Sequence, residues 1–183
     1  MPDLSQPAGA FAGIIQRLLN ATVCDGITIQ AYVYNLEPAR VLVGHGLSKT
    51  SLEVQPFRLR IGRGTPHGWL EISYRLSLDD EGKYLTVVSS YVGIYANNDE
   101  RSMLCHMDYE RDKPHGYPEA HLQVDGDSAA LKAWRLTDGT TDRAMHDLHF
   151  PVGGRRYRPV LEDVIEFLIV ERLAAARPGW QNC

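Results

Sequence analysis

Hydrophobic residues recur at helical spacing near both ends of the chain. Near the N-terminus this spacing predicts a helix over residues 7–20. Its apolar face comprises Phe11, Ile14, Ile15, Leu18 and Leu19. Near the C-terminus a broad apolar stripe follows Pro159, and proline is favoured at the first position of a helix. The stripe extends to Leu173 and predicts a second, mostly buried helix of about 17 residues.

Between these segments the hydrophobic period changes to two, which is typical of half-buried strands. Apolar and polar residues alternate most clearly over residues 70–77, before an acidic turn at 79–82 and a returning strand over 84–95. Further strands are predicted over residues 27–34, 57–61, 103–109, 120–124 and 146–152, and residues 41–43 are a candidate for one short additional strand. We therefore expect a single α+β domain over residues 1–183. In it a mainly antiparallel sheet of about six or seven strands follows an N-terminal helix, and a C-terminal helix packs on the sheet.

Composition narrows the class of protein. The chain has 183 residues, of which 19 are Lys or Arg and 23 are Asp or Glu, so the formal net charge is −4. This balance disfavours a whole surface that binds nucleic acid but allows a local basic patch. The widely spaced Cys24, Cys105 and Cys183 fit free thiols better than a disulfide framework. Because there is no apolar run of roughly 18 residues and Asp3 does not suit a secretory signal, we expect a cytoplasmic protein with no membrane partner.

Three histidines are predicted to share the polar face of neighbouring strands. Of the seven histidines in the chain, five fall in one stretch: His106, His115, His121, His146 and His149. Strand alternation places three of them on the face away from the core, each beside a polar residue. These pairs are His106 with Asp108, His121 with Gln123, and His149 with Asp147. If their three strands are neighbours, His106, His121 and His149 converge.

Two chemistries can use such a cluster. Three imidazoles can ligate Zn²⁺ or another divalent metal and leave a position for water, with Asp108 or Asp147 orienting them. Alternatively, two histidines with pKa values near 6.5 can act as base and acid on a phosphodiester without a metal. The spacing does not choose between them, so no metal ligand is assigned and the cofactor is unknown.

A segment rich in glycine and arginine follows the predicted His149 strand directly. Its predicted anion-binding residues are Gly153, Gly154, Arg155, Arg156 and Arg158. Backbone amides, the positive end of the next helix and guanidinium groups all favour a phosphate or carboxylate at this point. In the alternative interpretation the glycines only form a turn, and the arginines pair with acidic residues of the last helix.

Roughly the last 80 residues resemble an uncharacterised family of bacterial proteins. The resemblance rests on residues 106–109 (HMDY), 118–124 (PEAHLQV), 148–159 (LHFPVGGRRYRP) and 161–167 (LEDVIEF). The His-x-Asp-Tyr pattern and the histidine-bearing strand are also similar to small toxin-like proteins of bacterial toxin–antitoxin and defence loci. The resemblance implies RNA or nucleotide chemistry and assigns no residue a role.

The leading hypothesis is a nuclease or phosphodiesterase-type hydrolase acting on a phosphate-containing substrate, RNA or nucleotide. In this hypothesis His121 and His149 form the acid–base pair, His106 with Asp108 orients or assists, and the arginines neutralise the phosphate. One alternative is a non-enzymatic interaction module, such as a partner protein in a toxin–antitoxin or mobile-element operon. The other is a His-ligated metal protein. Two helices cannot cover both faces of such a sheet, which favours a homodimer as one way to cover the rest.

Overall fold

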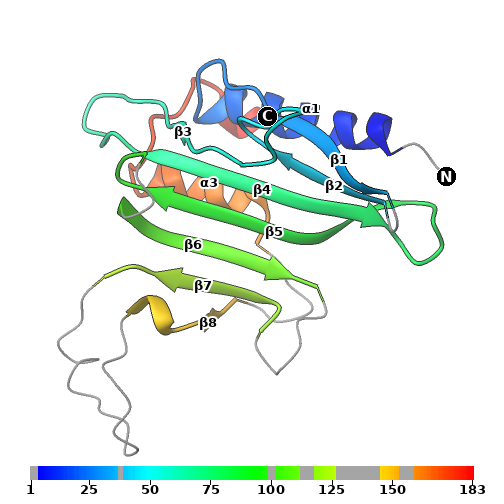
Figure 1. The fold of residues 1–183 in the computed structure, drawn as a ribbon. Coiled ribbons are helices and arrows are strands. Elements are labelled where there is room, and N and C mark those ends of the chain that lie inside the picture. The colour runs from blue at the N-terminus through cyan, green and yellow to red at the C-terminus, as the bar shows by residue number, and fades with distance from the viewer. Residues whose placement is uncertain (1–3, 37–38, 99–101, 112–117, 127–144, 153–158) are drawn as a thin grey trace, which may run out of the picture.

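The computed structural model describes residues 4–36, 39–98, 102–111, 118–126, 145–152 and 159–183. Helices α1 (Ser5–Thr22) and α3 (Leu161–Val170) flank a series of strands along the chain, and two 3₁₀ turns, η2 (Met145–Asp147) and η4 (Trp180–Asn182), lie in the C-terminal part (Figure 1). The strands are β1 (Gln30–Leu36), β2 (Ala39–Gly44), β3 (Phe57–Arg58), β4 (Trp69–Leu78), β5 (Leu85–Tyr95), β6 (Met103–Glu110), β7 (Ala120–Val124) and β8 (Phe150–Pro151).

All strands described belong to one antiparallel sheet. Their order is β1-β2-β4-β5-β6-β7-β8, and β3 pairs with one end of β4 (Figure 1). β3 is shorter than the predicted strand over 57–61, because the amide of Arg60 donates a hydrogen bond of 2.7 Å to the carbonyl of Val23 instead of pairing with β4. The predicted α+β class, with a mainly antiparallel sheet between an N-terminal and a C-terminal helix, is confirmed.

The longest strand pair, β4 with β5, turns at the acidic segment predicted from the sequence. The Oδ1 atom of Asp79 accepts hydrogen bonds from the amides of Lys83 (2.7 Å) and Tyr84 (3.1 Å). Gly82 has φ +69°, a left-handed conformation that costs glycine little because it has no Cβ. This turn joins β4 to β5 and sets their pairing as far as Leu76 with Val87, beyond which the register shifts.

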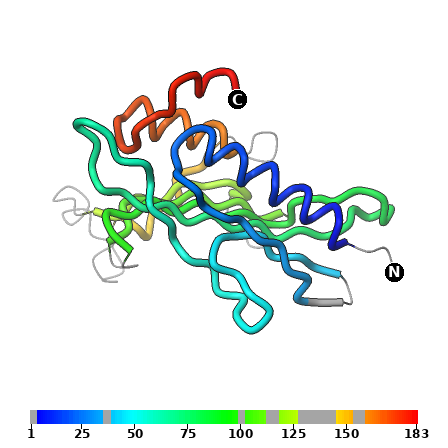
Figure 2. The backbone as a smooth tube through the Cα atoms, turned by 90° about the horizontal axis from the view of Figure 1, so that it is seen from above, coloured from blue at the N-terminus to red at the C-terminus, as the bar shows by residue number. Residues whose placement is uncertain are grey.

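Both helices pack on the same face of the sheet (Figure 2). The core between them is one contiguous cluster, which includes Leu19, Val41, Val43, Leu70, Ile72, Leu76, Ile94 and Leu168. We call the other face of the sheet, which no described helix covers, the open face. None of the helices in the described part of the chain is long and apolar enough to cross a membrane.

Helix α1 is slightly longer than predicted, and its buried stripe is rotated. The residues that face the core are Ala8, Ala12, Ile15 and Leu19, whereas Ile14, expected on the buried face, is 54% exposed. The small side chains of the two alanines allow the helix to approach the sheet closely. The hydrophobic pattern therefore identified the helix but not its final rotation.

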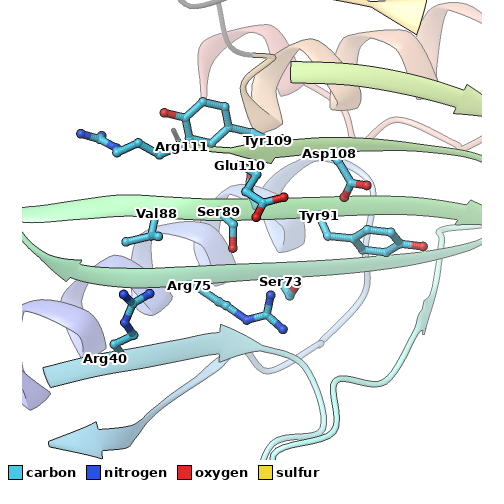
Figure 3. A pocket seen from close by; sticks show the side chains of 11 residues that line it. Arg40, Ser73, Arg75, Val88, Ser89, Tyr91, Asp108, Tyr109, Glu110 and Arg111 are labelled. Atoms are coloured by element: carbon cyan, nitrogen blue, oxygen red, sulfur yellow. The ribbon is translucent and has the colours of Figure 1, made fainter. Parts of the chain in front are cut away.

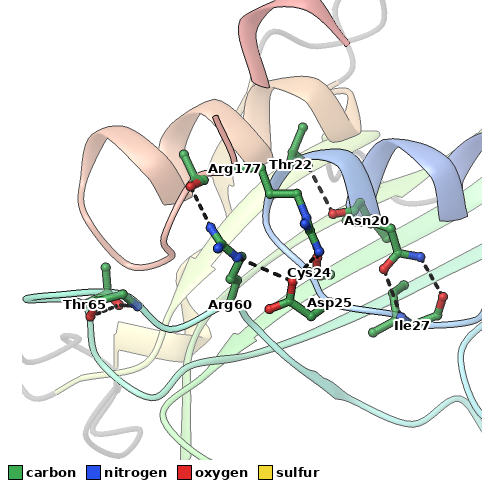
Figure 4. A network of polar contacts seen from close by, with 11 residues as sticks. Asn20, Thr22, Cys24, Asp25, Ile27, Arg60, Thr65 and Arg177 are labelled. Carbon is green, nitrogen blue, oxygen red and sulfur yellow. Dashed lines mark hydrogen bonds and ion pairs between the residues drawn. The ribbon is translucent and has the colours of Figure 1, made fainter. Parts of the chain in front are cut away.

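Side chains of α1 also delay the start of the first strand. The Asn20 amide accepts a hydrogen bond from the Ile27 nitrogen (2.9 Å) and donates one to the Ile27 oxygen (2.8 Å), as Figure 4 shows. Gln16 accepts one from the amide of Ile29 (2.9 Å). These side chains satisfy backbone groups that a neighbouring strand would otherwise pair, so β1 begins at Gln30 instead of the predicted residue 27.

Two arginines tie the C-terminal segment to the loop after α1 (Figure 4). Arg60 donates to the carbonyl of Ala176 (2.9 Å), and its Nε lies 3.4 Å from Oδ1 of Asp25. Arg177 forms an ion pair with the same carboxylate and donates to the carbonyl of Cys24 (3.3 Å). This network holds the C-terminal segment against the helical side of the sheet, away from the open face.

Helix α3 has 10 residues instead of the predicted 17. The amides of Leu173 and Ala174 both donate hydrogen bonds to the carbonyl of Leu168, at 2.8 and 3.0 Å. Arg172, which precedes them, adopts φ 59°. Leu173 still packs against the core from this turn. The apolar period therefore continues past the point where the helix ends.

The predicted strand over residues 146–152 is wrong for most of its length. Residues Met145–Asp147 form the 3₁₀ turn η2, closed by a hydrogen bond of 3.1 Å from the amide of Leu148 to the carbonyl of Met145, and β8 covers only Phe150–Pro151. Proline has no amide hydrogen, so Pro151 cannot donate to a ladder. Asp147 consequently does not lie on a strand beside His149, as the alternation had predicted.

Candidate functional site

Cross-strand pairing arranges the polar residues of the open face in rows that cross the sheet. Directly opposed residues of an antiparallel pair point to the same side. One row contains Ser73, Tyr91, Asp108 and His121. The row on one side contains Glu71, Gly93, His106 and Gln123, and the row on the other side contains Arg75, Ser89 and Glu110. Residues far apart in the sequence therefore share one polar surface.

Asp108 joins two of the predicted histidines at the centre of this surface. Its Oδ2 atom lies 3.4 Å from Nε2 of His106 and 3.5 Å from Nε2 of His121. The ring of His149, two residues before Pro151 in β8, lies against the ring of His121 with centroids 4.7 Å apart. We call His106, His121, His149 and Asp108 the histidine cluster. Its members meet because β6, β7 and β8 are neighbours, the condition on which the sequence prediction depended.

Burial and mutual contact set the charge of the cluster. The side chains of His121, His106 and Asp108 are 1%, 13% and 31% exposed. Burial alone would raise the pKa of the Asp108 carboxyl, but hydrogen bonds from His106 and His121, together with their charges, lower it well below its usual range. The hydrogen bond to Asp108 raises the pKa of His106, whereas burial lowers it. The charge of Asp108 and a hydrogen bond to Gln123 raise it further. Asp108 is thus a carboxylate that favours a protonated His106.

The neighbours of His106 determine which of its nitrogens carries a proton in the neutral ring. The amide nitrogen of Gln123 donates to the carbonyl of His146, which orients its Oε1 atom toward Nε2 of His106 at 2.8 Å. Since Nε2 faces only oxygen acceptors, it donates to Gln123 and Asp108. Nδ1 of His106 and Nδ1 of His121 are both buried and have no hydrogen-bond partner among the described residues.

A chain of tyrosines extends the histidine cluster across the sheet. The ring of Tyr91 stacks on that of His106, with centroids 5.4 Å apart and planes at 30°. Its hydroxyl lies 2.6 Å from that of Tyr95, which lies 3.2 Å from a carboxylate oxygen of Glu71. Burial, and then the hydrogen bond with Tyr95, raise the pKa of Tyr91. A Cβ atom at Gly93 would lie 2.6 Å from the Tyr91 hydroxyl, so the absence of a side chain there makes room for this contact.

A pocket of about 380 Å³ adjoins the histidine cluster on the open face (Figure 3). Asp108 belongs to both. The other charged residues of its wall are Arg40, Arg75, Arg111 and Glu110, and Ser73, Ser89 and Tyr91 also line it. Figure 3 shows Arg40 and Arg75 on the side of β2 and β4, and Asp108 and Glu110 on the side of β6.

Sequence reasoning missed these pocket arginines. In the sequence Arg75 is only one polar position of the alternating segment over residues 70–77, and Arg40 and Arg111 lie at strand ends far from each other in the chain. No local motif joins them. The signal that could have found them is the strand order, because β2, β4, β5 and β6 are adjacent.

Other predicted residues lie elsewhere. Asp147 turns its side chain toward His146, with Oδ1 and Nε2 3.6 Å apart, while its carbonyl oxygen lies 3.2 Å from Nδ1 of His149. Arg58 of β3 lies over the ring of Trp69, and β5 and β6 separate its partner strand β4 from β7. The predicted anion-binding residues Gly153, Gly154, Arg155, Arg156 and Arg158, and also His115, lie outside the described residues.

The described residues do not form a metal site. In the described part of the chain, no group of three or more His, Cys, Asp or Glu side chains could hold a metal ion. In the histidine cluster Nε2 of His106 and Nε2 of His121 both point at Asp108, so the carboxylate occupies the point where their Nε2 lone pairs would meet a cation. What the arrangement offers is proton transfer between a carboxylate and imidazoles.

No protein-family model, curated protein or solved structure matches this chain. The resemblance to toxin-like bacterial proteins therefore stays a prediction.

Proposed function

We propose that the protein binds a phosphate-containing substrate, RNA or nucleotide, on the open face and cleaves it by acid–base catalysis. One observation carries this proposal. Asp108 contacts the imidazoles of His106 and His121 and also forms part of the wall of a pocket that contains arginines. Proton-transfer groups and cationic groups thus lie on one face of the sheet and meet at Asp108, so one extended ligand can contact both.

Burial distributes the roles within the histidine cluster. His121 is 1% exposed, so it acts as a positioning residue between Asp108 and His149. His149 is half-buried, and it is the member that we expect to meet the substrate. As a base, its imidazole takes the proton from the attacking water or ribose hydroxyl while the new P–O bond forms. As an acid, a protonated imidazole of the cluster gives a proton to the leaving oxygen while the old P–O bond breaks.

The arginines neutralise the phosphate in this scheme. Among the described residues, neither Arg40 nor Arg75 takes part in an ion pair. Guanidinium groups bind phosphate oxygens in a bidentate manner, so these arginines anchor a phosphate of the substrate on the open face. We place this activity in the cytoplasm, because Cys24, Cys105 and Cys183 are free thiols, as a reducing compartment favours.

The test compares cleavage by wild-type protein and by His149→Ala. The substrates are a 5′-labelled single-stranded RNA and a chromogenic phosphodiester, each at pH values from 5 to 8. General acid–base groups contribute on the order of 100-fold or more, so His149→Ala should lose at least that factor. His67→Ala, at an exposed histidine in the loop before β4, is the matched control and should cleave like wild type. A wild type that cleaves neither substrate, or a His149→Ala protein as active as wild type, would overturn the proposal.

A further inference from the structure

The pocket is hollow because short side chains lie between long ones. Ser89 stands directly between Arg75 and Glu110, since it pairs with both across the strands. In the next row, Ser73 pairs with Tyr91. Neighbouring strands are about 4.8 Å apart, so the backbones of β4 and β6 are separated by roughly 10 Å with only a serine between the two charged residues. That width accommodates a ring and its substituents. We call this hollow the serine-floored pocket.

Its two walls carry opposite charge. Arg40 and Arg75 form the wall on β2 and β4, and Asp108 and Glu110 form the wall on β6 (Figure 3). No ion pair between described residues joins one wall to the other. A ligand that satisfies both walls has an oxyanion at one end and hydrogen-bond donors at the other.

We infer that the serine-floored pocket binds a ribose phosphate unit, with the phosphate on Arg40 and Arg75 and the ribose hydroxyls donating to Asp108 and Glu110. The inference rests on the proposed function for the choice of phosphate as the anion. The volume of about 380 Å³ lies in the range of small-molecule sites and exceeds what a single phosphate fills. Carboxylates only accept hydrogen bonds, so they select the sugar diol and repel a second phosphate.

This orientation connects the serine-floored pocket to the chemistry. Asp108 lines the pocket and also contacts His121, which lies against His149. A ribose hydroxyl bound at Asp108 is therefore the part of the ligand nearest to the histidine cluster. The same arrangement predicts selectivity for ribose over sugars without that diol.

Calorimetric titration tests the inference with defined probes. The probes are adenosine 5′-monophosphate, ribose 5-phosphate, inorganic phosphate, adenosine, the 2′,3′-dideoxy monophosphate and a trinucleotide of RNA. Adenosine 5′-monophosphate and ribose 5-phosphate should bind alike, and the other small probes at least tenfold more weakly. Tighter binding of the trinucleotide than of the monophosphate identifies a nucleotide within RNA as the ligand, and the reverse identifies a free nucleotide. Equal binding of adenosine and its monophosphate, or no binding by any probe at millimolar concentration, would refute the inference.

Three variants locate the site. Arg75→Gln should weaken binding of ribose 5-phosphate at least tenfold. Ser89→Leu, which changes no charge but fills the floor, should abolish binding while the far-ultraviolet circular dichroism spectrum stays that of wild type. Arg17→Gln, the same change on the exposed side of α1, is the control and should bind like wild type. Wild-type affinity in both Arg75→Gln and Ser89→Leu would overturn the assignment of the pocket.

The two proposals can fail separately. If His149→Ala binds ribose 5-phosphate like wild type while wild type cleaves no RNA, the ribose phosphate site stands and the hydrolase proposal falls. If wild type cleaves RNA and Arg75→Gln and Ser89→Leu cleave it equally well, catalysis stands and the substrate does not use the serine-floored pocket.

Discussion

Replacing Asp108 by asparagine tests the electrostatic argument for the histidine cluster most directly. The carboxylate accepts from Nε2 of both His106 and His121, at 3.4 and 3.5 Å. An asparagine keeps the size of the side chain, but it has a single acceptor oxygen and no charge. Its NH₂ group would face one of the two imidazole N–H groups, so one histidine must change its tautomer or lose its partner.

The expected loss of stability depends on pH. Hydrogen bonds to charged groups contribute about 1.5–3 kcal/mol each, and the variant keeps one in weaker form, so we expect a loss of about 1–3 kcal/mol at pH 5.5. The raised pKa of His106 stabilises the fold fully below its unfolded value near 6.5, and this contribution disappears as the pH rises through the folded value. Asp108 has a lowered pKa, so its contribution is lost only as the pH falls through the acid range. At pH 8 the loss in the variant should therefore be smaller than at pH 5.5.

Urea unfolding of wild type and Asp108→Asn at pH 5.5 and 8.0 measures both losses, and a proton NMR titration of His106 measures its pKa. The titration should show a lower pKa of His106 in the variant. Asp147→Asn is the control, because this carboxylate is 44% exposed and its ion pair with His146 should be worth less than about 0.5 kcal/mol. An equal loss at both pH values, with an unchanged pKa of His106, would refute the view that Asp108 holds a protonated imidazole.

Two further predictions concern the packing of the fold. Gly93→Ala should lower the free energy of unfolding by about 1–3 kcal/mol, because the new Cβ would lie 2.6 Å from the Tyr91 hydroxyl. A denaturant titration measures this loss. A variant as stable as wild type would mean that the tyrosine contact is not tight. Burial raises the pKa of Cys24 to about 12, whereas Cys183 is exposed. An aromatic disulfide reagent at pH 8 should therefore modify Cys183 and leave Cys24 unmodified until the protein is unfolded. Peptide mass analysis after labelling measures the order of modification, and earlier labelling of Cys24 would contradict the prediction.

The fold was predictable wherever one hydrophobic period was uninterrupted. The alternation over residues 70–77 and the acidic turn after it gave β4 and its hairpin almost to the residue. Prediction failed where tertiary contacts replaced local ones. The side chains of Asn20 and Gln16 in α1 accept hydrogen bonds from the backbone amides of residues 27 and 29. The hydrophobic pattern within the predicted strand gives no sign of these contacts.

The candidate site was predictable in part for the same reason. Alternation placed His106, Asp108 and His121 on one face, and the structure brings them together because β6 and β7 form a direct antiparallel pair. His149 reaches the same place even though most of its predicted strand is absent, since β8 preserves the pairing of Pro151 with His121. The pocket arginines were not predictable, because their proximity depends on the order of four strands.

The energetic cost of the histidine cluster favours a chemical role over a merely structural one. Removing a carboxylate and imidazoles from water costs free energy, and replacing such a buried pair by apolar residues is often neutral or stabilising. Here Nδ1 of His106 and Nδ1 of His121 are also buried without a hydrogen-bond partner among the described residues, which adds to that cost. Perturbed titratable groups beside a cavity are concentrated at functional sites. A sheet face that served only as a solvated surface, or as a contact for another protein, would gain nothing from holding Asp108 between two imidazoles, whereas acid–base catalysis can use imidazoles that a carboxylate orients.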